Sequence, residues 1–249
     1  MAMIEIKNIS KWYGNFQVLK DCSVDVEKGE VVVVCGPSGS GKSTLIKTVN
    51  ALEPFQKGEI IVDGISVGDP KTNLPQLRSR VGMVFQHFEL FPHLSIRENL
   101  VLAQMKVLGR GREEATERGL KLLDRVGLLK HADKFPGQMS GGQQQRVAAA
   151  RALVTDPTMI MADEPTGALD SKSARLLLES LEALNRRLRA TVLMVTHDSF
   201  AASYTSRVLF IRDGKIFTEL RRGDTDRREF FDRIMEVVAM MGGEGSDAL

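Results

Sequence analysis

A glycine-rich loop between an apolar run and a helical pattern constrains the fold of this chain more than any other feature. The loop has the spacing G-x-x-x-x-G-K-[ST], from Gly36 to Ser43, with an apolar run at 31–34 before it and a helical pattern at 45–49 after it. This strand, loop and helix order is the context that a phosphate-binding loop requires. Glycines let backbone N–H groups turn toward phosphate oxygens, and the helix N-terminus adds partial positive charge. We therefore predict a nucleoside triphosphate site here.

The residues of this phosphate loop have distinct expected tasks. Lys42 is expected to reach the β- and γ-phosphates, and the Ser43 hydroxyl is expected to bind Mg²⁺. The predicted cofactors are ATP and Mg²⁺. The residues of the loop predicted to contact the nucleotide are Gly36, Pro37, Ser38, Gly39, Ser40, Gly41, Lys42, Ser43 and Thr44.

Two carboxylates follow a second apolar run, at 159–162. Because this run predicts a parallel strand, Asp163 is expected at its carboxyl end beside the phosphate loop, where open parallel sheets bind ligands. One carboxylate is enough to hold Mg²⁺, so Glu164 is free to orient or deprotonate the attacking water. An acidic pair in this position is otherwise an ordinary solvated strand end, and the partnership with Lys42 favours the catalytic interpretation.

A third motif, Ser140-Gly141-Gly142-Gln143, stands directly before a helical stretch. Its glycines predict a second exposed helix N-terminus with free backbone N–H groups. The motif resembles the signature sequence of ATP-binding cassette ATPases, with Met139 where that family most often has Leu. The resemblance implies that this signature motif completes the ATP pocket of a partner protomer. Two copies of the chain would then form an ATP-dependent, head-to-tail homodimer.

The same resemblance implies roles for four further positions. Tyr13 resembles the aromatic residue that stacks on adenine, and the neighbouring Trp12 is the alternative. Gln86 resembles the glutamine that senses Mg²⁺ and the attacking water while linking the core to a helical subdomain. Asp170 resembles a loop residue that crosses the dimer interface, or it is simply the N-cap of the next helix. His197 resembles the switch histidine that contacts the γ-phosphate.

Taken together, the motifs predict one composite site. Its expected catalytic residues are Glu164, His197, Gln86 and Lys42. Its expected metal ligands are Ser43, Gln86 and Asp163. The nucleotide contacts expected outside the phosphate loop are Tyr13, Ser140, Gly141, Gly142, Gln143 and Asp170.

Periodicity predicts an α/β fold with a mostly parallel sheet in a phosphate-loop NTPase core. Short alternating strands are expected through 3–35, and later strands alternate with helices as in a sheet covered on both faces. A capping box at Ser95 opens a helical region. The expected organisation is one domain at 1–241, with an N-terminal antiparallel β subdomain, a nucleotide-binding core at 1–94 and 136–241, a helical subdomain at 95–135, and a disordered tail at 242–249.

Composition argues against several classes of partner. The net charge is only +2 and the basic residues are dispersed, so nucleic-acid binding is not expected. Two cysteines, Cys22 and Cys35, are too few for a disulfide framework and are typical of reduced cytosolic thiols. No stretch approaches the ~18 apolar residues needed for a membrane span. We expect a peripheral protein at the cytoplasmic face of the membrane. The resemblance implies integral-membrane permease subunits as partners and, through them, a substrate-binding protein.

The two halves of the chain resemble different branches of the ATP-binding cassette family. The first half, for example at 82–94, is similar to ATPases of glutamate, aspartate and glutamine importers. The second half, at 166–170 and 196–204, resembles ATPases of bacitracin-type antimicrobial-peptide transporters. The resemblance changes from one branch to the other at 140–146, where the sequence is common to both branches. We therefore hypothesise a natural or artificial chimera, with a divergent protein of single origin as the alternative.

The resemblance places the permease-docking surface at Gln86 and the helical subdomain, so partner choice should follow the first half. We expect a subunit that binds and hydrolyses ATP to energise uptake of a polar amino acid, with antimicrobial-peptide export as the alternative. A DNA-repair ATPase of this family needs a long coiled-coil insertion, and a translation-factor relative normally carries two cassettes. A phosphate-loop kinase of small molecules leaves the signature motif unexplained.

Overall fold

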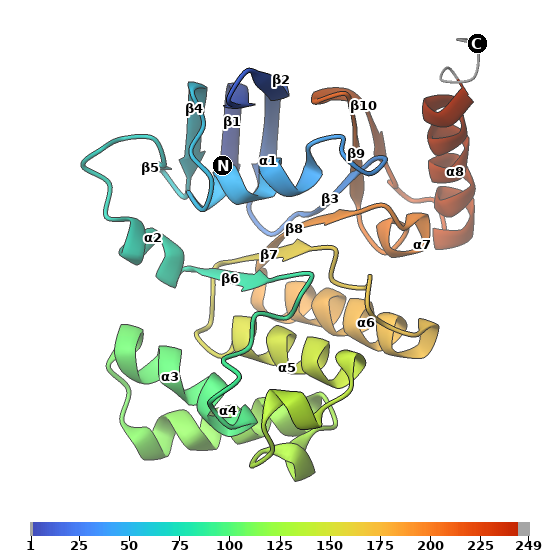
Figure 1. The fold of residues 1–249 in the computed structure, drawn as a ribbon. Coiled ribbons are helices and arrows are strands. Elements are labelled where there is room, and N and C mark those ends of the chain that lie inside the picture. The colour runs from blue at the N-terminus through green and yellow to red at the C-terminus, as the bar shows by residue number, and fades with distance from the viewer. Residues whose placement is uncertain (1, 244–249) are drawn as a thin grey trace.

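Two sheets and the helices around them make up the computed structural model, which describes residues 2–243 apart from the side chains of residues 184, 187, 188 and 243 (Figure 1). The strands are β1 (Ala2–Tyr13), β2 (Phe16–Glu27), β3 (Val31–Cys35), β4 (Lys57–Val62), β5 (Ile65–Ser66), β6 (Val81–Val84), β7 (Met159–Asp163), β8 (Thr191–Thr196), β9 (Arg207–Arg212) and β10 (Lys215–Arg221). The helices are α1 (Lys42–Val49), α2 (Leu74–Ser79), α3 (Ile96–Leu108), α4 (Arg112–Arg125), η1 (Leu129–His131), η2 (Pro136–Gln138), α5 (Gly141–Leu153), α6 (Ser171–Leu188), α7 (Ser199–Ala202) and α8 (Arg227–Gly243). The predicted α/β class is confirmed.

The larger sheet determines where the functional motifs meet. Its strand order is β10-β9-β3-β8-β7-β6. Strand β3 pairs in parallel with β8 and β9, and β7 pairs in parallel with β6 and β8. Only the edge strand β10 of these described strands runs antiparallel to its neighbour. The carboxyl ends of β3, β7 and β8 therefore lie at one edge, as the sequence predicts. The predicted N-terminal subdomain is the antiparallel sheet β2-β1-β4-β5.

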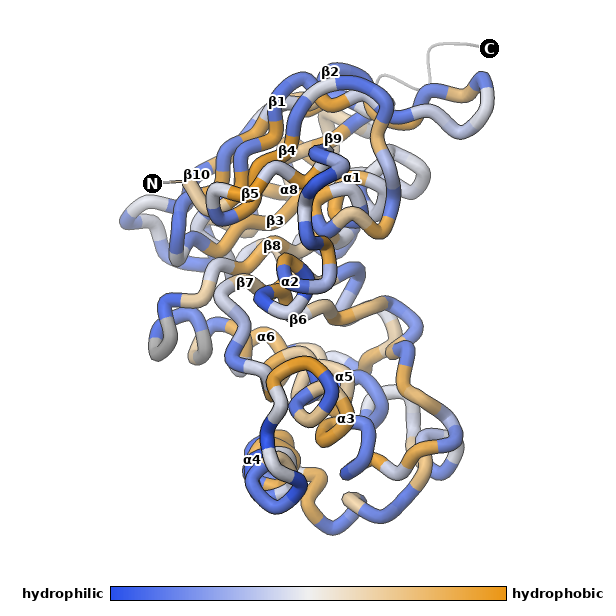
Figure 2. The backbone as a smooth tube through the Cα atoms, turned by 90° about the vertical axis from the view of Figure 1, so that its left-hand side faces the viewer, coloured by the Kyte–Doolittle hydropathy of each residue, from blue (hydrophilic) through white to orange (hydrophobic). Residues whose placement is uncertain are grey.

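Side chains of the larger sheet alternate between two cores. Val32 and Val34 join the core formed with α1 and the antiparallel sheet. Val33 and Cys35 face the other way, into the core shared with α5, α6 and α8. Because both faces are buried, the strand reads as a continuous apolar run. Figure 2 shows these apolar strands in the interior of the sheet region, with α3, α4 and α5 grouped below it.

Helix α5 joins the sheet region to the helical region. Its Ala149 and Ala152 pack against the sheet, whereas Val147 and Ala150 pack against α3 and α4. The predicted capping box is present, because the Ser95 Oγ accepts a hydrogen bond from the Glu98 N–H at 3.2 Å. This single helix therefore sets the position of the helical region relative to the nucleotide-binding core.

The structure departs from the predicted elements in a few places. Helix α2, strand β10 and the short helix α7 are not anticipated by the periodicity. Helix α8 ends at Gly243, so Gly242 and Gly243 are helical and not part of the expected tail. The rest of that predicted tail, 244–249, lies outside the described residues. No helix within residues 2–243 is long and apolar enough to cross a membrane.

The two buried thiols should be unreactive in the folded protein. Both cysteines are free, and burial raises the pKa of Cys35 to about 11 and also raises that of Cys22. The neutral thiol then predominates at pH 8, and the thiolate is the reactive form. We expect iodoacetamide at pH 8 to label neither cysteine in the native protein and both in guanidinium, as measured by mass spectrometry. Rapid labelling of the native protein would contradict the buried positions.

Candidate functional site

The phosphate loop connects β3 to α1 in a conformation that only glycine tolerates at two positions. A Cβ at Gly36 would lie 2.2 Å from the Ile211 carbonyl oxygen, which is far inside contact distance. Gly41 has φ +102°, and its Cβ would meet the Leu19 side chain at 2.9 Å. Pro37, Ser38 and Gly39 are exposed at the tip of the loop, whereas Ser40 is buried beneath it. The motif glycines thus allow the backbone to close tightly at the N-terminus of α1.

Lys42 is held inside this loop by the loop's own carbonyls. Its Nζ donates to the carbonyl oxygens of Gly36 at 2.8 Å and Pro37 at 2.9 Å. Burial lowers the pKa of the Lys42 ammonium, and the nearby Glu164 opposes this effect. A partly desolvated ammonium that bonds only to neutral carbonyls in these contacts is well placed to turn toward a phosphate group.

Asp163 lies beside the phosphate loop, where the sequence predicts it. The Ser43 hydroxyl donates to Asp163 Oδ1 at 2.8 Å, and Lys47 Nζ lies 3.8 Å from Asp163 Oδ2. The parallel pairing of β7 and β3 with β8 brings these residues together although they are 120 positions apart. Two of the three predicted metal ligands, Ser43 and Asp163, are therefore adjacent, and both offer the hard oxygen donors that Mg²⁺ prefers.

Glu164 and His197 form a contact that the motifs did not predict. Glu164 follows β7 directly, is 7% exposed and has φ +47°. Its Oε2 lies 2.9 Å from His197 Nδ1 and accepts the Thr196 hydroxyl at 3.3 Å. Both partners come from the end of β8, the strand next to Glu164 in the sheet. The carboxylate proposed as a base is thus oriented by two neighbouring groups.

Between the two candidate adenine-stacking residues, the geometry favours Tyr13. The Tyr13 side chain is 45% exposed and Lys11 Nζ lies 4.4 Å from its ring centroid. Partial burial raises the Tyr13 pKa, and a hydrogen bond to Thr44 opposes that effect. Trp12 instead has its ring beside Lys57, at 5.5 Å. Tyr13 is therefore the aromatic residue beside the phosphate loop.

The signature motif caps helix α5. Ser140 Oγ accepts from the Gln143 N–H at 3.3 Å, and Gln143 Oε1 accepts from the Ser140 N–H at 2.9 Å. Helix α5 covers the face of the sheet opposite to α1, as the two separate cores require. No hydrogen bond recorded among residues 2–243 joins the signature motif to the phosphate loop of the same chain. The structure does not bring these two predicted phosphate sites together within one protomer.

Asp170 lies beside the signature motif and also acts as a helix cap. Its carboxylate accepts from the backbone N–H groups of Lys172 at 3.0 Å and Ser173 at 2.9 Å, and these bonds lower its pKa. The alternative N-cap interpretation is thus correct as a description of the free protomer. A Cβ at Gly142 would lie 3.5 Å from the Leu169 side chain, so the loop before Asp170 adjoins the signature motif.

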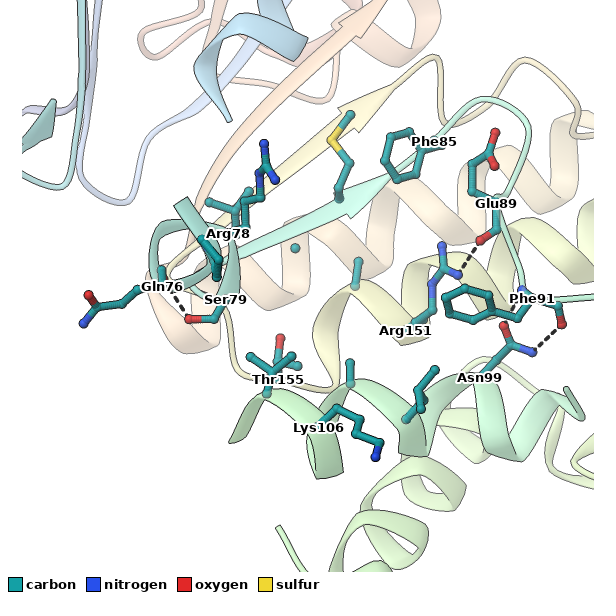
Figure 3. Close-up of a pocket in the computed structure, with 18 of the residues that line it drawn as sticks. Gln76, Arg78, Ser79, Phe85, Glu89, Phe91, Asn99, Lys106, Arg151 and Thr155 are labelled. Atoms are coloured by element: carbon teal, nitrogen blue, oxygen red, sulfur yellow. Dashed lines mark hydrogen bonds between the residues drawn. The ribbon is translucent and has the colours of Figure 1, made fainter. Parts of the chain in front are cut away.

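Gln86 is exposed in the segment that follows β6, and this segment leads into a groove. The interlobe groove has a volume of about 1030 Å³ and lies between α2 and β6 on one side and α3 on the other (Figure 3). Phe85, Glu89 and Phe91 line one wall, and Arg151 from α5 points into it (Figure 3). The segment 85–91 therefore connects the Gln86 position to the groove.

A sequence model of the ABC transporter family matches residues 19–167, which hold the phosphate loop, the signature motif and the acidic pair. The chain belongs to the ABC transporter family. It is an ATPase domain of that family, and ATP hydrolysis coupled to transport is the family's activity.

Similar proteins cover nearly the whole chain. The glutamate/aspartate import ATP-binding protein GltL of Escherichia coli K12 is 62% identical over 92% of this chain and 93% of its own length. The bacitracin export ATP-binding protein BceA of Halalkalibacterium halodurans is 44% identical over 99% of this chain and 100% of its own. Both resemblances noted in the sequence are confirmed. Because each alignment runs through both halves, the chimera hypothesis stays a prediction.

A solved structure gives the same fold. The dimeric post-hydrolysis structure of the ATP-binding cassette MJ0796, bound to ADP and Pi, superposes with a TM-score of 0.83. It is 37% identical to this chain and covers 88% of it and 98% of MJ0796. The phosphate-loop core, the antiparallel sheet and the inserted helices are therefore those of an ABC ATPase.

Sequence reasoning missed several residues that the geometry brings to the site. Thr196 and Lys11 contact predicted site residues but were not themselves predicted as site residues. A docking surface was expected at Gln86 and the helical subdomain, but the groove and its α2 wall were not, although Asn73 before Pro75 is a recognisable helix start. Arg151 was also missed, because its partners are backbone carbonyls that no sequence pattern identifies.

Two substitutions should separate nucleotide binding from hydrolysis. Lys42→Ala removes the ammonium aimed at the phosphates, and we expect nucleotide affinity to fall about 100-fold, the size of one or two charge-assisted hydrogen bonds. Glu164→Gln removes the carboxylate base but keeps the shape of the side chain. We expect near-normal ATP binding with steady-state hydrolysis reduced about 100-fold or more. Fluorescent-nucleotide titration and phosphate release measure the two effects.

The exposed Glu113 on α4 supplies the matched control. Glu113→Gln makes the same chemical change far from the phosphate loop and should leave both quantities unchanged. Normal hydrolysis by the Glu164→Gln protein would refute the base assignment.

Proposed function

We propose that this chain is the ATP-hydrolysing subunit of a transporter that takes up a polar amino acid. The 62% identity to GltL over 92% of the chain is the observation that supports a polar amino acid as the substrate class. The chain would lie at the cytoplasmic face of the membrane, bound to integral permease subunits and, through them, served by a substrate-binding protein.

ATP binding follows from the side chains at the edge of the large sheet. The phosphate loop would cradle the phosphates, and the exposed face of Tyr13 would stack on adenine. Ser43 and Asp163 would hold Mg²⁺ together with phosphate oxygens, with Gln86 joining from the segment after β6. Bound Mg²⁺ would neutralise charge on the phosphates. Glu164 would take the proton of the attacking water, while His197 holds its carboxylate and contacts the γ-phosphate.

The signature motif would act on the phosphates of a second protomer. It makes no hydrogen bond, within the described residues, to the phosphate loop of its own chain, and the N–H groups of Gly141 and Gly142 make a suitable anion site. Two protomers related head to tail would then enclose two ATP molecules, with Asp170 close to the interface. Hydrolysis removes the γ-phosphate link and lets the dimer reopen.

The permease would dock in the interlobe groove. The groove is open, has apolar side chains at Phe91, Leu102 and Val107, and lies between the nucleotide-binding core and the helices of 95–135, which we propose as the inserted helical subdomain. A short amphipathic helix of the permease is the element that fits such a groove. Closure of the ATPase dimer would move this groove and so transmit force to the permease.

Antimicrobial-peptide export is the second candidate. It is favoured by the second half of the chain at 166–170 and 196–204, and by the alignment to BceA, which covers 99% of this chain. The two candidates differ in the permease that the first half recognises, so permease pairing decides between them.

Permease pairing gives a direct test. We expect co-expression with a glutamate/aspartate-type permease to give ATP-dependent uptake of labelled glutamate, and pairing with a bacitracin-type permease to give no resistance. Specific coupling to the bacitracin-type permease alone would contradict the proposal.

Two neighbouring residues of α3 provide a matched pair for the docking surface. Val107 lines the groove and is 55% exposed, whereas Leu108 is 39% exposed and does not line it. Val107→Glu would place a carboxylate against the docked permease, so uptake should fall about tenfold or more. Leu108→Glu should retain uptake, and equal losses in both variants would argue against the groove as the docking site.

A further inference from the structure

Two consecutive residues beside the groove hold an unusual backbone conformation. Phe88 has φ +63° and Glu89 has φ +50°, the left-handed region that residues with a Cβ seldom adopt. Such a conformation costs free energy and persists where surrounding contacts hold it in place. The two residues directly follow Gln86 and His87, so their conformation determines the path of the segment that carries Gln86.

Arg151 supplies the contacts that hold this segment. Its Nη2 donates to the Phe88 carbonyl oxygen at 3.0 Å, and its Nη1 donates to the Glu89 carbonyl oxygen. Figure 3 shows the Arg151 side chain reaching from α5 to the backbone oxygen of Glu89, while the Glu89 carboxylate points away from it. The planar guanidinium can satisfy two adjacent carbonyls at once, and an ammonium cannot do so in the same geometry.

Other contacts along α5 extend this attachment. Gln145 Nε2 lies 3.5 Å from the Phe85 carbonyl oxygen, and a Cβ at Gly141 would lie 3.5 Å from Cζ of the Phe88 ring. Gly141 and Gln145 are one helical turn apart, whereas Arg151 lies near the C-terminal end of α5, so α5 contacts the segment 85–89 at Phe85, Phe88 and Glu89. The helix that begins with the signature motif is therefore joined to the segment that carries Gln86.

Arg151 also belongs to the groove. It lines the wall together with Glu89, and burial lowers the pKa of its guanidinium, with Glu89 opposing this effect. An occupant of the groove would thus lie against the same residue that fixes the segment 85–89. Contacts made in the groove would reach this segment through Arg151, and also through Phe85, which lines the groove next to Gln86.

We propose that Arg151 is a positioning residue that fixes the segment 85–89 on α5, sets the reach of Gln86 toward the phosphates, and transmits occupancy of the groove to the ATP site. The transmission part rests on the proposed docking of a permease in the groove. The positioning part concerns the isolated chain, so the two parts can fail separately.

The test of positioning uses Arg151→Lys in the purified full-length chain without a permease. We expect kcat for ATP hydrolysis to fall about tenfold, the size expected for losing one charge-assisted hydrogen bond, with KM for ATP unchanged because the phosphate loop and Tyr13 are untouched. Amide exchange should accelerate in peptides that cover 85–91 and stay unchanged at 31–36. Gln86→Ala should likewise lower kcat and leave KM for ATP unchanged.

The matched control is Arg118→Lys. Arg118 Nε donates at 2.7 Å to the carbonyl oxygen of Val154, the C-cap of α5, and the hydrogen bonds of Arg118 go to Val154 and Asp156 rather than to the segment 85–89. This variant loses the same type of bond and should keep the wild-type kcat. Arg151→Gln, which keeps one amide donor, gives a second variant should the lysine variant fail to fold, and it should show the same pattern.

A rescue experiment distinguishes positioning from a general structural role. Glu89→Gly lowers the cost of a positive φ. In the Arg151→Lys background it should therefore restore part of the lost kcat. The positioning role would be overturned by a wild-type kcat in the Arg151→Lys variant or by the absence of rescue by Glu89→Gly. It would also be overturned if kcat and KM changed together and amide exchange accelerated throughout the chain.

Transmission from the groove to the ATP site is tested in the transporter reconstituted with a glutamate/aspartate-type permease. The ratio of ATPase rates with and without permease should be above one for the wild type and fall close to one for Arg151→Lys. An unchanged ratio would overturn transmission and leave positioning intact. A wild-type chain that shows no stimulation by this permease, but stimulation by a bacitracin-type one, would contradict the proposed function instead.

Discussion

The parallel pairing of β3, β8 and β7 determines where the functional residues of this chain meet. It places the carboxyl ends of three strands at one edge of the sheet, and a functional residue or loop lies at the end of each strand. Strand β3 leads into the phosphate loop, β7 ends in Asp163, and β8 leads to His197. Because both faces of these strands are buried, a shift of register by one residue would exchange the two cores. The bond between Ser43 and Asp163 and the contact between Glu164 and His197 both follow from this register.

Helix α5 is the second structural determinant, because three regions meet on it. One face packs on the sheet, another packs on α3 and α4, and its N-terminus carries the signature motif. The side that holds the segment 85–89 through Arg151 makes the same helix a neighbour of the groove and of Gln86. A rigid-body movement of this helix would therefore affect the signature motif, the groove and Gln86 together, which is the property that a coupled transporter ATPase needs.

Much of the site could be predicted from the sequence, because the motifs record local requirements. Steric limits of the loop itself require glycine at Gly36 and Gly41, and the predicted capping box at Ser95 depends on only four residues. The resemblance favoured Tyr13 over Trp12, but the residues alone could not decide between them, since the pairing of β1 with β2 is irregular between Lys11 and Trp12. Arg151 could not be found either, because its partners exist only once Phe88 and Glu89 adopt their positive φ angles.

If the signature motif of one protomer completes the ATP site of another, ATP should bring two protomers together. Light scattering on the Glu164→Gln protein, with and without Mg·ATP, measures this association. We expect a nucleotide-dependent change from monomer to dimer, and a Gly142→Asp substitution in the same background should abolish it, since a carboxylate would then oppose the phosphates at the helix N-terminus. A protein that binds ATP and remains monomeric would show that the signature motif does not act on a second protomer.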